Sequence, residues 1–264
     1  MTPPSTVTQK QSPQGDPAVA EIEFRDVWKS FGPKKVLRGF SLSIGRGETV
    51  AILGASGSGK SVLLRHIVGL MNADRGEVLV NGEDVGGMDD KALLVIRRKV
   101  ALIFQANALF DSMNIFDNVA FGLKEQRRLT KQEIAAKVGS ALAMVGLENV
   151  EHQMPADLSG GMRKRVALAR SMVLEPDAIL YDEPTSGLDP ITGHMVSSLI
   201  RDMAAKLHVT SVVVTHDIAS AMMVADRMSL LGEGRAVFVG TPEEARRSSQ
   251  REVREFFFAY GDMI

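Results

Sequence analysis

The sequence predicts an α/β protein in which a phosphate-loop NTPase core carries an antiparallel β-subdomain and an inserted helical subdomain. A short apolar run at 48–54 enters a glycine-rich turn and then a helical pattern, the context that a phosphate loop requires. Strand signals fade over about 106–157, and we expect a helical subdomain over about 106–173. The β-rich runs 177–184 and 210–217 then end in polar residues, as parallel strands do where they meet a ligand.

The remaining elements complete this prediction in chain order. Alternating apolar and polar residues predict further strands within 21–32, 37–48, 76–85, 99–105 and 227–240. Asn81-Gly82 is a hairpin turn signal. Thr130 and Glu133 form a capping box before a helical segment. We expect a folded domain over 21–245 and a tail over 246–264 that begins with a short helix.

The composition of the chain excludes several kinds of site and partner. The chain has 264 residues, 45% of them hydrophobic, enough for one large α/β domain. A formal net charge of −1 gives no sign of a nucleic-acid partner, and the absence of cysteine excludes disulfides and thiolate metal sites. Residues 1–20 are rich in polar residues and proline, and we expect them to be disordered. No apolar run is long enough to span a membrane.

The stretch GASGSGKS at 54–61 predicts an ATP site. Glycines at 57 and 59 let backbone N–H groups point at phosphate oxygens. Lys60 would reach the β- and γ-phosphates, and the Ser61 hydroxyl would bind Mg²⁺. The alternative is a glycine-rich turn that contains a lysine by chance. The predicted nucleotide contacts here are Gly54, Ala55, Ser56, Gly57, Ser58, Gly59, Lys60, Ser61 and Val62.

Polar residues at the ends of predicted strands supply catalytic candidates. Asp182 would hold Mg²⁺ through water, and Glu183 would polarise or deprotonate the attacking water. Gln105 would contact that water or Mg²⁺, and His216 would donate a hydrogen bond to the γ-phosphate. Each alone is compatible with an ordinary solvated loop or polar cap. Asp189 is a further nucleotide candidate, or a turn residue before proline.

A second anion site is predicted at Ser159, Gly160 and Gly161, where a serine and two glycines open a helix. Three cations at 163–165 follow in the same helix, where the helix dipole disfavours them. We expect these charges to serve an anion bound at the helix start. The alternative is a solvated face.

The order of these motifs resembles the ATP-binding subunit of ABC transporters over about residues 21–245. The resemblance implies the ABC ATPase fold and a head-to-tail homodimer with two ATPs at the interface. The serine-glycine helix of one subunit would then contact the γ-phosphate bound by the other. Phe31 takes the place of the aromatic side chain that stacks on adenine, with Trp28 as a nearby competitor.

Three features resemble the ATPases of MCE-type, Mla-like phospholipid transporters: Met162 after the two glycines, GLDPIT at 187–192, and the segment 108–123. This implies a peripheral location on the cytoplasmic face of the bacterial inner membrane, a permease and an MCE-type lipid-binding partner. The permease would dock at a groove near Leu109–Val119, although about half of its apolar residues should pack internally. Those apolar residues are Leu109, Phe110, Met113, Ile115, Phe116 and Val119.

Other ABC subunits remain alternatives, namely those of an amino-acid importer or a lipoprotein extractor. A chromosome-maintenance ATPase would need a long coiled coil or a zinc insertion, and this chain has neither heptads nor cysteine. A translation-type ABC protein would need two ATPase heads in one chain. The aromatic run Phe256, Phe257 and Phe258 would be unusual in solvent, so we expect the tail to contact the partner ATPase.

Overall fold

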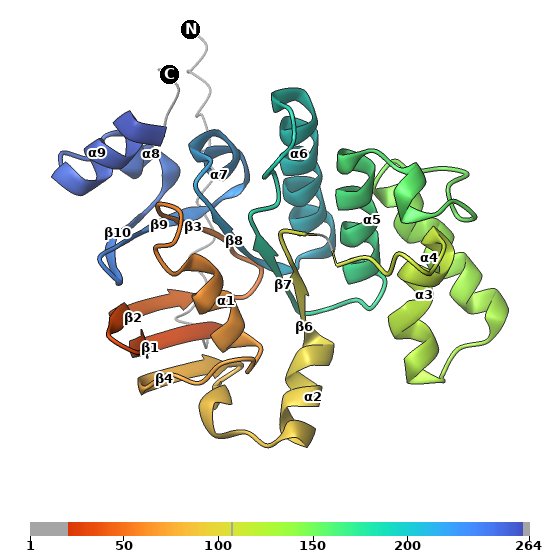
Figure 1. Ribbon diagram of the computed structural model, residues 1–264, viewed down its shortest axis with the longest axis horizontal. Coiled ribbons are helices and arrows are strands. Elements are labelled where there is room, and N and C mark those ends of the chain that lie inside the picture. Colours follow the sequence, from red (N-terminus) through yellow and green to blue (C-terminus); the bar gives the residue numbers. More distant parts are fainter. Residues whose placement is uncertain (1–20, 107, 261–264) are drawn as a thin grey trace, which may run out of the picture.

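The computed structural model describes residues 21–106 and 108–260, and the expectation of a disordered tail over 1–20 lies outside these residues. Two sheets form the architecture (Figure 1). The strands are β1 (Ile22–Phe31), β2 (Lys34–Ile44), β3 (Thr49–Leu53), β4 (Arg75–Val80), β5 (Glu83–Asp84), β6 (Val100–Ile103), β7 (Ala178–Asp182), β8 (Thr210–Thr215), β9 (Arg227–Gly232) and β10 (Arg235–Gly240).

Helices cover the larger sheet and extend to one side of it (Figure 1). They are α1 (Lys60–Ile67), α2 (Asp90–Lys99), α3 (Ile115–Gln126), α4 (Lys131–Met144), α5 (Gly160–Met172), α6 (Pro190–Leu207), α7 (Ile218–Val224), α8 (Pro242–Arg246) and α9 (Arg251–Tyr260). Two short 3₁₀ helices lie at Val85–Gly87 and Pro155–Asp157. Among the described residues, no helix is long and apolar enough to cross a bilayer.

The larger sheet has the strand order β10-β9-β3-β8-β7-β6. Its strands from β9 to β6 are parallel, and β10 adds an antiparallel edge. Strands β3, β7 and β8 are almost wholly buried, as central parallel strands covered on both faces must be. Their carboxyl ends therefore meet at one edge of the sheet, where α/β proteins bind ligands.

The smaller sheet is antiparallel, in the order β2-β1-β4-β5, and it confirms the predicted β-subdomain. The turn between β4 and β5 has positive φ at both Asn81 (52°) and Gly82 (81°). Both central residues of a type I′ turn need this conformation, so the Asn-Gly signal correctly located the hairpin. This sheet lies beside the larger sheet (Figure 1). Phe31 is the last residue of its strand β1.

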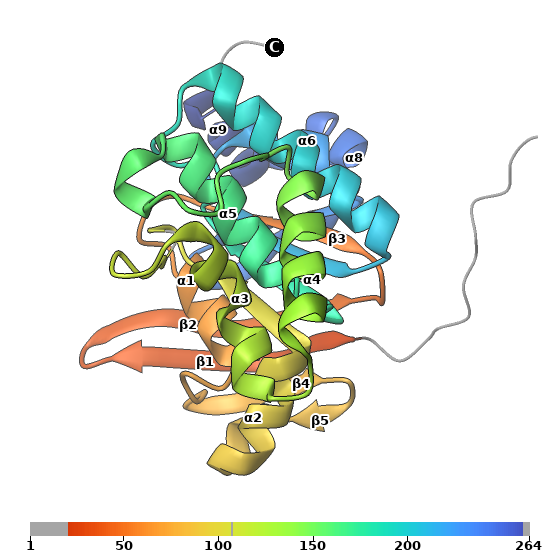
Figure 2. The same cartoon turned by 90° about the vertical axis from the view of Figure 1, so that its right-hand side faces the viewer.

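Helices α3, α4 and α5 occupy the range where the sequence predicts a helical subdomain. They lie to one side of the larger sheet in Figure 1 and toward the viewer, in front of it, in Figure 2. Thr130 and Glu133 form the expected capping box at the start of α4. One apolar cluster runs from α3 and α4 through α5 to β7 and α6. Because α5 packs on the sheet as well as on α3 and α4, these helices share a core with the sheet. The boundary of about 106–173 therefore stays a prediction.

The tail folds back on its own chain. Phe256 is buried, and Phe257 packs partly against the same apolar cluster at the β9–β10 edge of the sheet. Phe258 is 91% exposed. Of the three aromatic residues that suggested an external contact, two are therefore accounted for by packing within the chain, and one is left on the surface.

Candidate functional site

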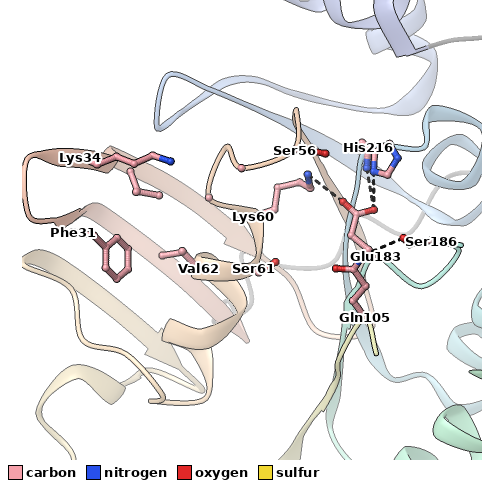
Figure 3. Close-up of a pocket in the computed structure, with 13 residues that line it drawn as sticks. Phe31, Lys34, Ser56, Lys60, Ser61, Val62, Gln105, Glu183, Ser186 and His216 are labelled. Carbon is pink, nitrogen blue, oxygen red and sulfur yellow. Dashed lines mark hydrogen bonds and ion pairs between the residues drawn. The ribbon is translucent and has the colours of Figure 1, made fainter. Parts of the chain in front are cut away.

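A cavity of about 600 Å³ lies where β1, the loop after β3 and the ends of β6, β7 and β8 converge (Figure 3). The cavity lies at the carboxyl edge of the parallel strands. The sequence predicted that the polar residues at the ends of these strands meet a ligand. The residues that line it are Phe31, Lys34, Val36, Ser56, Gly57, Gly59, Lys60, Ser61, Val62, Gln105, Glu183, Ser186 and His216.

The loop between β3 and α1 has the backbone that phosphate binding requires. Gly57 and Gly59 have φ values of +75° and +112°, which side-chain-bearing residues rarely adopt. A Cβ at Gly59 would lie 2.6 Å from Val36 Cγ1, so this position requires glycine for space as well. Gly59 caps α1, and the first N–H groups of that helix lack helical partners, which makes the helix start an anion site. Gly54, Ala55 and Ser58 belong to the loop without lining the cavity.

Lys60 places its ammonium among oxygens at the cavity. Its Nζ donates to the carbonyls of Gly54 (2.8 Å) and Ala55 (3.2 Å) and lies 3.1 Å from Glu183 Oε1. Lys60 and Glu183 are only 5% and 8% exposed, so this is a buried ion pair. A buried cation is stable only with anionic or carbonyl partners, and a bound phosphate would be such a partner.

Glu183 lies between Lys60 and His216 (Figure 3). Its Oε2 is 3.0 Å from Nδ1 of His216 and accepts a hydrogen bond from Thr215 Oγ1 at 3.2 Å. The residue has φ of +49°, a left-handed conformation that costs free energy for any residue with a side chain. Such backbone strain concentrates at functional sites.

Asp182 and Ser61 form the second polar pair of the cavity region. Ser61 Oγ donates to Asp182 Oδ1 at 2.8 Å, which joins the start of α1 to the end of β7. Burial raises the pKa of Asp182, and the hydrogen bond from Ser61 opposes that rise. A hydroxyl and a carboxylate at this position are oxygen ligands of the kind that Mg²⁺ takes in phosphate-loop sites.

Gln105 and Phe31 lie on different sides of the cavity. Gln105 Nε2 donates to Ser186 Oγ at 3.1 Å. Phe31 is 47% exposed, with the Lys29 ammonium 5.9 Å from its ring. Trp28 instead donates to Asp26 and packs against Arg75, outside the cavity lining.

Sequence reasoning missed three lining residues, Ser186, Lys34 and Val36. Ser186 follows Glu183 by three residues, and this short distance along the chain was a signal that could have indicated it. Lys34 and Val36 come from β2, and only the pairing of β2 with β1 brings them to the phosphate loop. No local pattern in the sequence carries that information.

The serine-glycine stretch is separate from this cavity. Ser159 caps α5 by accepting a hydrogen bond from Met162 N at 3.2 Å, and Gly160 and Gly161 begin the helix. A Cβ at Gly161 would lie 2.3 Å from a Thr192 side-chain carbon in α6, so the close approach of α6 requires glycine. Ser159, Gly160 and Gly161 do not line the cavity that holds Lys60.

Asp189 lies outside the cavity lining as well. Its carboxylate accepts a hydrogen bond from Thr192 N at 3.0 Å and caps α6, with Pro190 at the first helical position. Hydrogen bonds from Thr192 hold the pKa of Asp189 below its usual value. The alternative interpretation of Asp189 was a turn residue before proline, and the structure shows that Asp189 begins helix α6 there.

The three cations of α5 have partners without a bound anion, so the structure lends no support to the expectation that they serve one, and the alternative of a solvated face is wrong. Each side chain donates to loop carbonyls on its own chain. Arg163 donates to Leu158 O, and Arg165 donates to Val145 and Gly146 at 3.2 and 3.0 Å. Lys164 is only 7% exposed and turns toward the loops that hold Gln105 and Glu183. The unfavourable position in the helix dipole is offset by these charge-assisted hydrogen bonds.

Comparison with known proteins agrees with this geometry. The ABC transporter family matches residues 37–186. The chain is 39% identical over 241 residues to the Escherichia coli (strain K12) intermembrane phospholipid transport system ATP-binding protein MlaF, covering 91% of this chain and 90% of MlaF. It is 41% identical over 247 residues to the Mycobacterium tuberculosis (strain H37Rv) probable ribonucleotide transport ATP-binding protein mkl, covering 94% of this chain and 69% of that protein.

Solved structures show the same fold. The dimeric, post-hydrolysis structure of the ATP-binding cassette MJ0796 with ADP and Pi aligns with a TM-score of 0.77 at 33% identity, over 84% of this chain and 98% of that one. The structure of CbiO1 from Clostridium perfringens aligns with a TM-score of 0.79 at 29% identity, over 91% and 98%. The chain therefore belongs to the ABC transporter family. Within that family it is an ATP-binding, ATP-hydrolysing subunit, as the sequence predicted.

Proposed function

We propose that two copies of this chain form a head-to-tail dimer in which each ATP contacts the cavity of one subunit and the Ser159–Gly161 stretch of the other. The separation of that stretch from the cavity within one chain is the observation that supports this arrangement. Both are backbone N–H sites at helix starts, and a triphosphate has enough oxygens for two of them.

The cavity residues have distinct roles in this proposal. The phosphate loop and Lys60 bind the phosphates, and Phe31 stacks on the adenine. Glu183 accepts a proton from the attacking water, and His216 donates to the γ-phosphate. Ser61, Asp182 and Gln105 would hold Mg²⁺, which would neutralise phosphate charge. A bound phosphate competes with Glu183 for the Lys60 ammonium, and thereby frees the carboxylate to act as a base.

Ser159→Arg tests whether the stretch serves a partner. The variant should lose at least about 100-fold in ATP turnover, the scale expected when donors to developing charge are removed. ATP binding to the monomer should be unchanged, because the cavity is intact. Turnover measurement and titration with a fluorescent ATP analogue check these two results. Thr241→Ala removes the comparable cap of α8 and controls for cap loss. Loss of monomer binding would place the stretch in its own chain's site.

The dimer is proposed to drive a membrane permease from the cytoplasmic face of the inner membrane. The predicted groove near Leu109–Val119 is only partly available, because Ile115 and Val119 are fully buried. An adjacent apolar pocket of about 260 Å³ includes Leu70, Phe104 and Leu174. Arg170 joins the two regions, with its guanidinium 4.6 Å from the Phe110 ring. This combined surface has the apolar character that a helix-in-groove contact needs.

The transported substrate is proposed to be a phospholipid, moved between the inner and outer membranes with an MCE-type partner. The near-complete coverage of MlaF, whose name states phospholipid transport, supports this class. The name of mkl instead states ribonucleotide transport. The alternative class of ABC subunit is that of an amino-acid importer or a lipoprotein extractor. Purification of the tagged chain from detergent-solubilised membranes, followed by mass spectrometry, should identify a permease, an MCE-type protein and bound phospholipid. A complex with an amino-acid or lipoprotein permease would contradict the assignment.

The tail is proposed to contribute to the dimer only through its exposed part. Of the three phenylalanines, Phe258 is the one left largely exposed for such a contact, because Phe256 and Phe257 pack within the chain. Deletion of the whole tail would therefore also remove part of the apolar core that α9 completes.

A further inference from the structure

Lys164 connects three functional segments of one chain. It lies on α5, five residues after Ser159, and its side chain reaches away from that helix toward the strand ends. Its Nζ lies 3.2 Å from the carbonyl oxygen of Gln105 and 3.4 Å from that of Glu183. The Lys164 side chain is buried; its hydrogen bond to Glu183 is buried as well, and the one to Gln105 is partly buried. A buried ammonium that donates to two carbonyls restrains the positions of both loops, the one with Gln105 and the one with Glu183.

The Glu183 peptide needs such a constraint. Its φ of +49° is disfavoured for a residue with a side chain, so neighbouring groups must hold it. The Glu183 N–H donates to Val214 O at 2.9 Å, and its carbonyl accepts from Ser186 N at 3.2 Å as well as from Lys164. Of these donors, Lys164 is the charged one, and it comes from a different element.

Two lysines thus approach Glu183 from different directions. Lys60 pairs with its side-chain carboxylate, whereas Lys164 bonds to its backbone carbonyl. Burial lowers the pKa of Lys164, and the carboxylates of Glu183 and Asp182 oppose that decrease. Lys164 can therefore fix the position of the carboxylate without competing for its oxygens.

We propose that Lys164 is a positioning residue for ATP hydrolysis. It holds the left-handed Glu183 peptide and the Gln105 carbonyl against α5, and so fixes the carboxylate of one ATP site relative to the Ser159–Gly161 stretch, which serves the other site. The inference rests on the proposed roles of Glu183 and of that stretch. Because one ammonium contacts both loops, a shift of α5 at the partner's nucleotide would move the carboxylate at its own.

Lys164→Met tests this role, since methionine keeps most of the volume and removes the donor. The variant should lose at least tenfold in kcat, while the Kd for ATP, measured by titration, stays within threefold. That split is the signature of a lost interaction in the hydrolytic step, and general misfolding would not produce it. Lys164→Gln retains an N–H donor on a shorter side chain, and its kcat should fall between those of Lys164→Met and the natural protein.

Arg165→Met is the matched control, because Arg165 is the next residue of α5 and donates to loop carbonyls away from the cavity. Its kcat should stay within twofold of the natural protein. A Lys164→Met protein with natural kcat, or an equal loss in Arg165→Met, would overturn the inference. If Lys164→Met does not fold, a threefold or larger loss in Lys164→Gln at unchanged Kd supports the inference and natural kcat overturns it. Glu183→Gln measured alongside separates the cases: normal hydrolysis there would instead refute the proposed role of Glu183.

Discussion

Lys60→Ala should abolish ATP turnover and weaken ATP binding by at least about 100-fold, as expected for loss of a charge-assisted contact to phosphate. The ammonium is buried among two carbonyls and the Glu183 carboxylate, and alanine leaves no cation at this position. Titration with a fluorescent ATP analogue gives the affinity, and release of inorganic phosphate gives the turnover.

The substitution has a second effect, because it leaves Glu183 as a buried carboxylate without its lysine. The melting temperature of Lys60→Ala should therefore be measured with its affinity, to show that the protein is folded. Lys137→Ala is a suitable control, since Lys137 lies on α4 and pairs with Glu175, away from the cavity. Normal ATP binding and turnover in folded Lys60→Ala would refute the phosphate-loop assignment.

Glu183→Gln should reduce turnover by at least about 100-fold, the contribution expected of a general base. ATP binding should persist, in contrast to Lys60→Ala. The neutral amide does not pair with the Lys60 ammonium as the carboxylate does, so the ammonium stays available to phosphate. Because ATP is then bound and not consumed, the variant should accumulate as an ATP-bound dimer. Phosphate release and size-exclusion chromatography with MgATP measure these two results.

Glu175→Gln provides the same chemical change at an exposed carboxylate whose side chain is 77% accessible. It should hydrolyse ATP at the natural rate and form no trapped dimer. A Glu183→Gln protein with natural turnover would show that another group activates the water, and the assignment of Glu183 as the base would be withdrawn.

The elements that were predicted from sequence are those with local signals. The phosphate loop, the Asn81-Gly82 turn and the capping box at Thr130 each depend on a few consecutive residues, and the structure has all three. Helix α6 carried a similar signal, Asp189 before Pro190 at the helix start, which was interpreted as a nucleotide contact or a turn. A capping aspartate with proline at the first helical position was the clue to this helix.

The features that were missed depend on contacts between distant segments. Lys164 lies 59 residues from Gln105 along the chain, and only the packing of α5 on the sheet makes them neighbours. The cations of α5 looked unfavourable because the helix alone was considered, without the loop carbonyls that surround it. The resemblance to ABC transporters supplied the family and the proposal of a shared ATP site, which no pattern within one chain could give.

The central claim is that each ATP site is completed by the partner's Ser159–Gly161 stretch. Native mass spectrometry with MgATP tests it most directly, because it reports chain and nucleotide stoichiometry together. Glu183→Gln should appear as a dimer with two ATPs. The double variant Glu183→Gln, Ser159→Arg should appear as monomers that each retain one ATP. A monomeric Glu183→Gln protein, or a double variant that still forms the two-ATP dimer, would contradict the account.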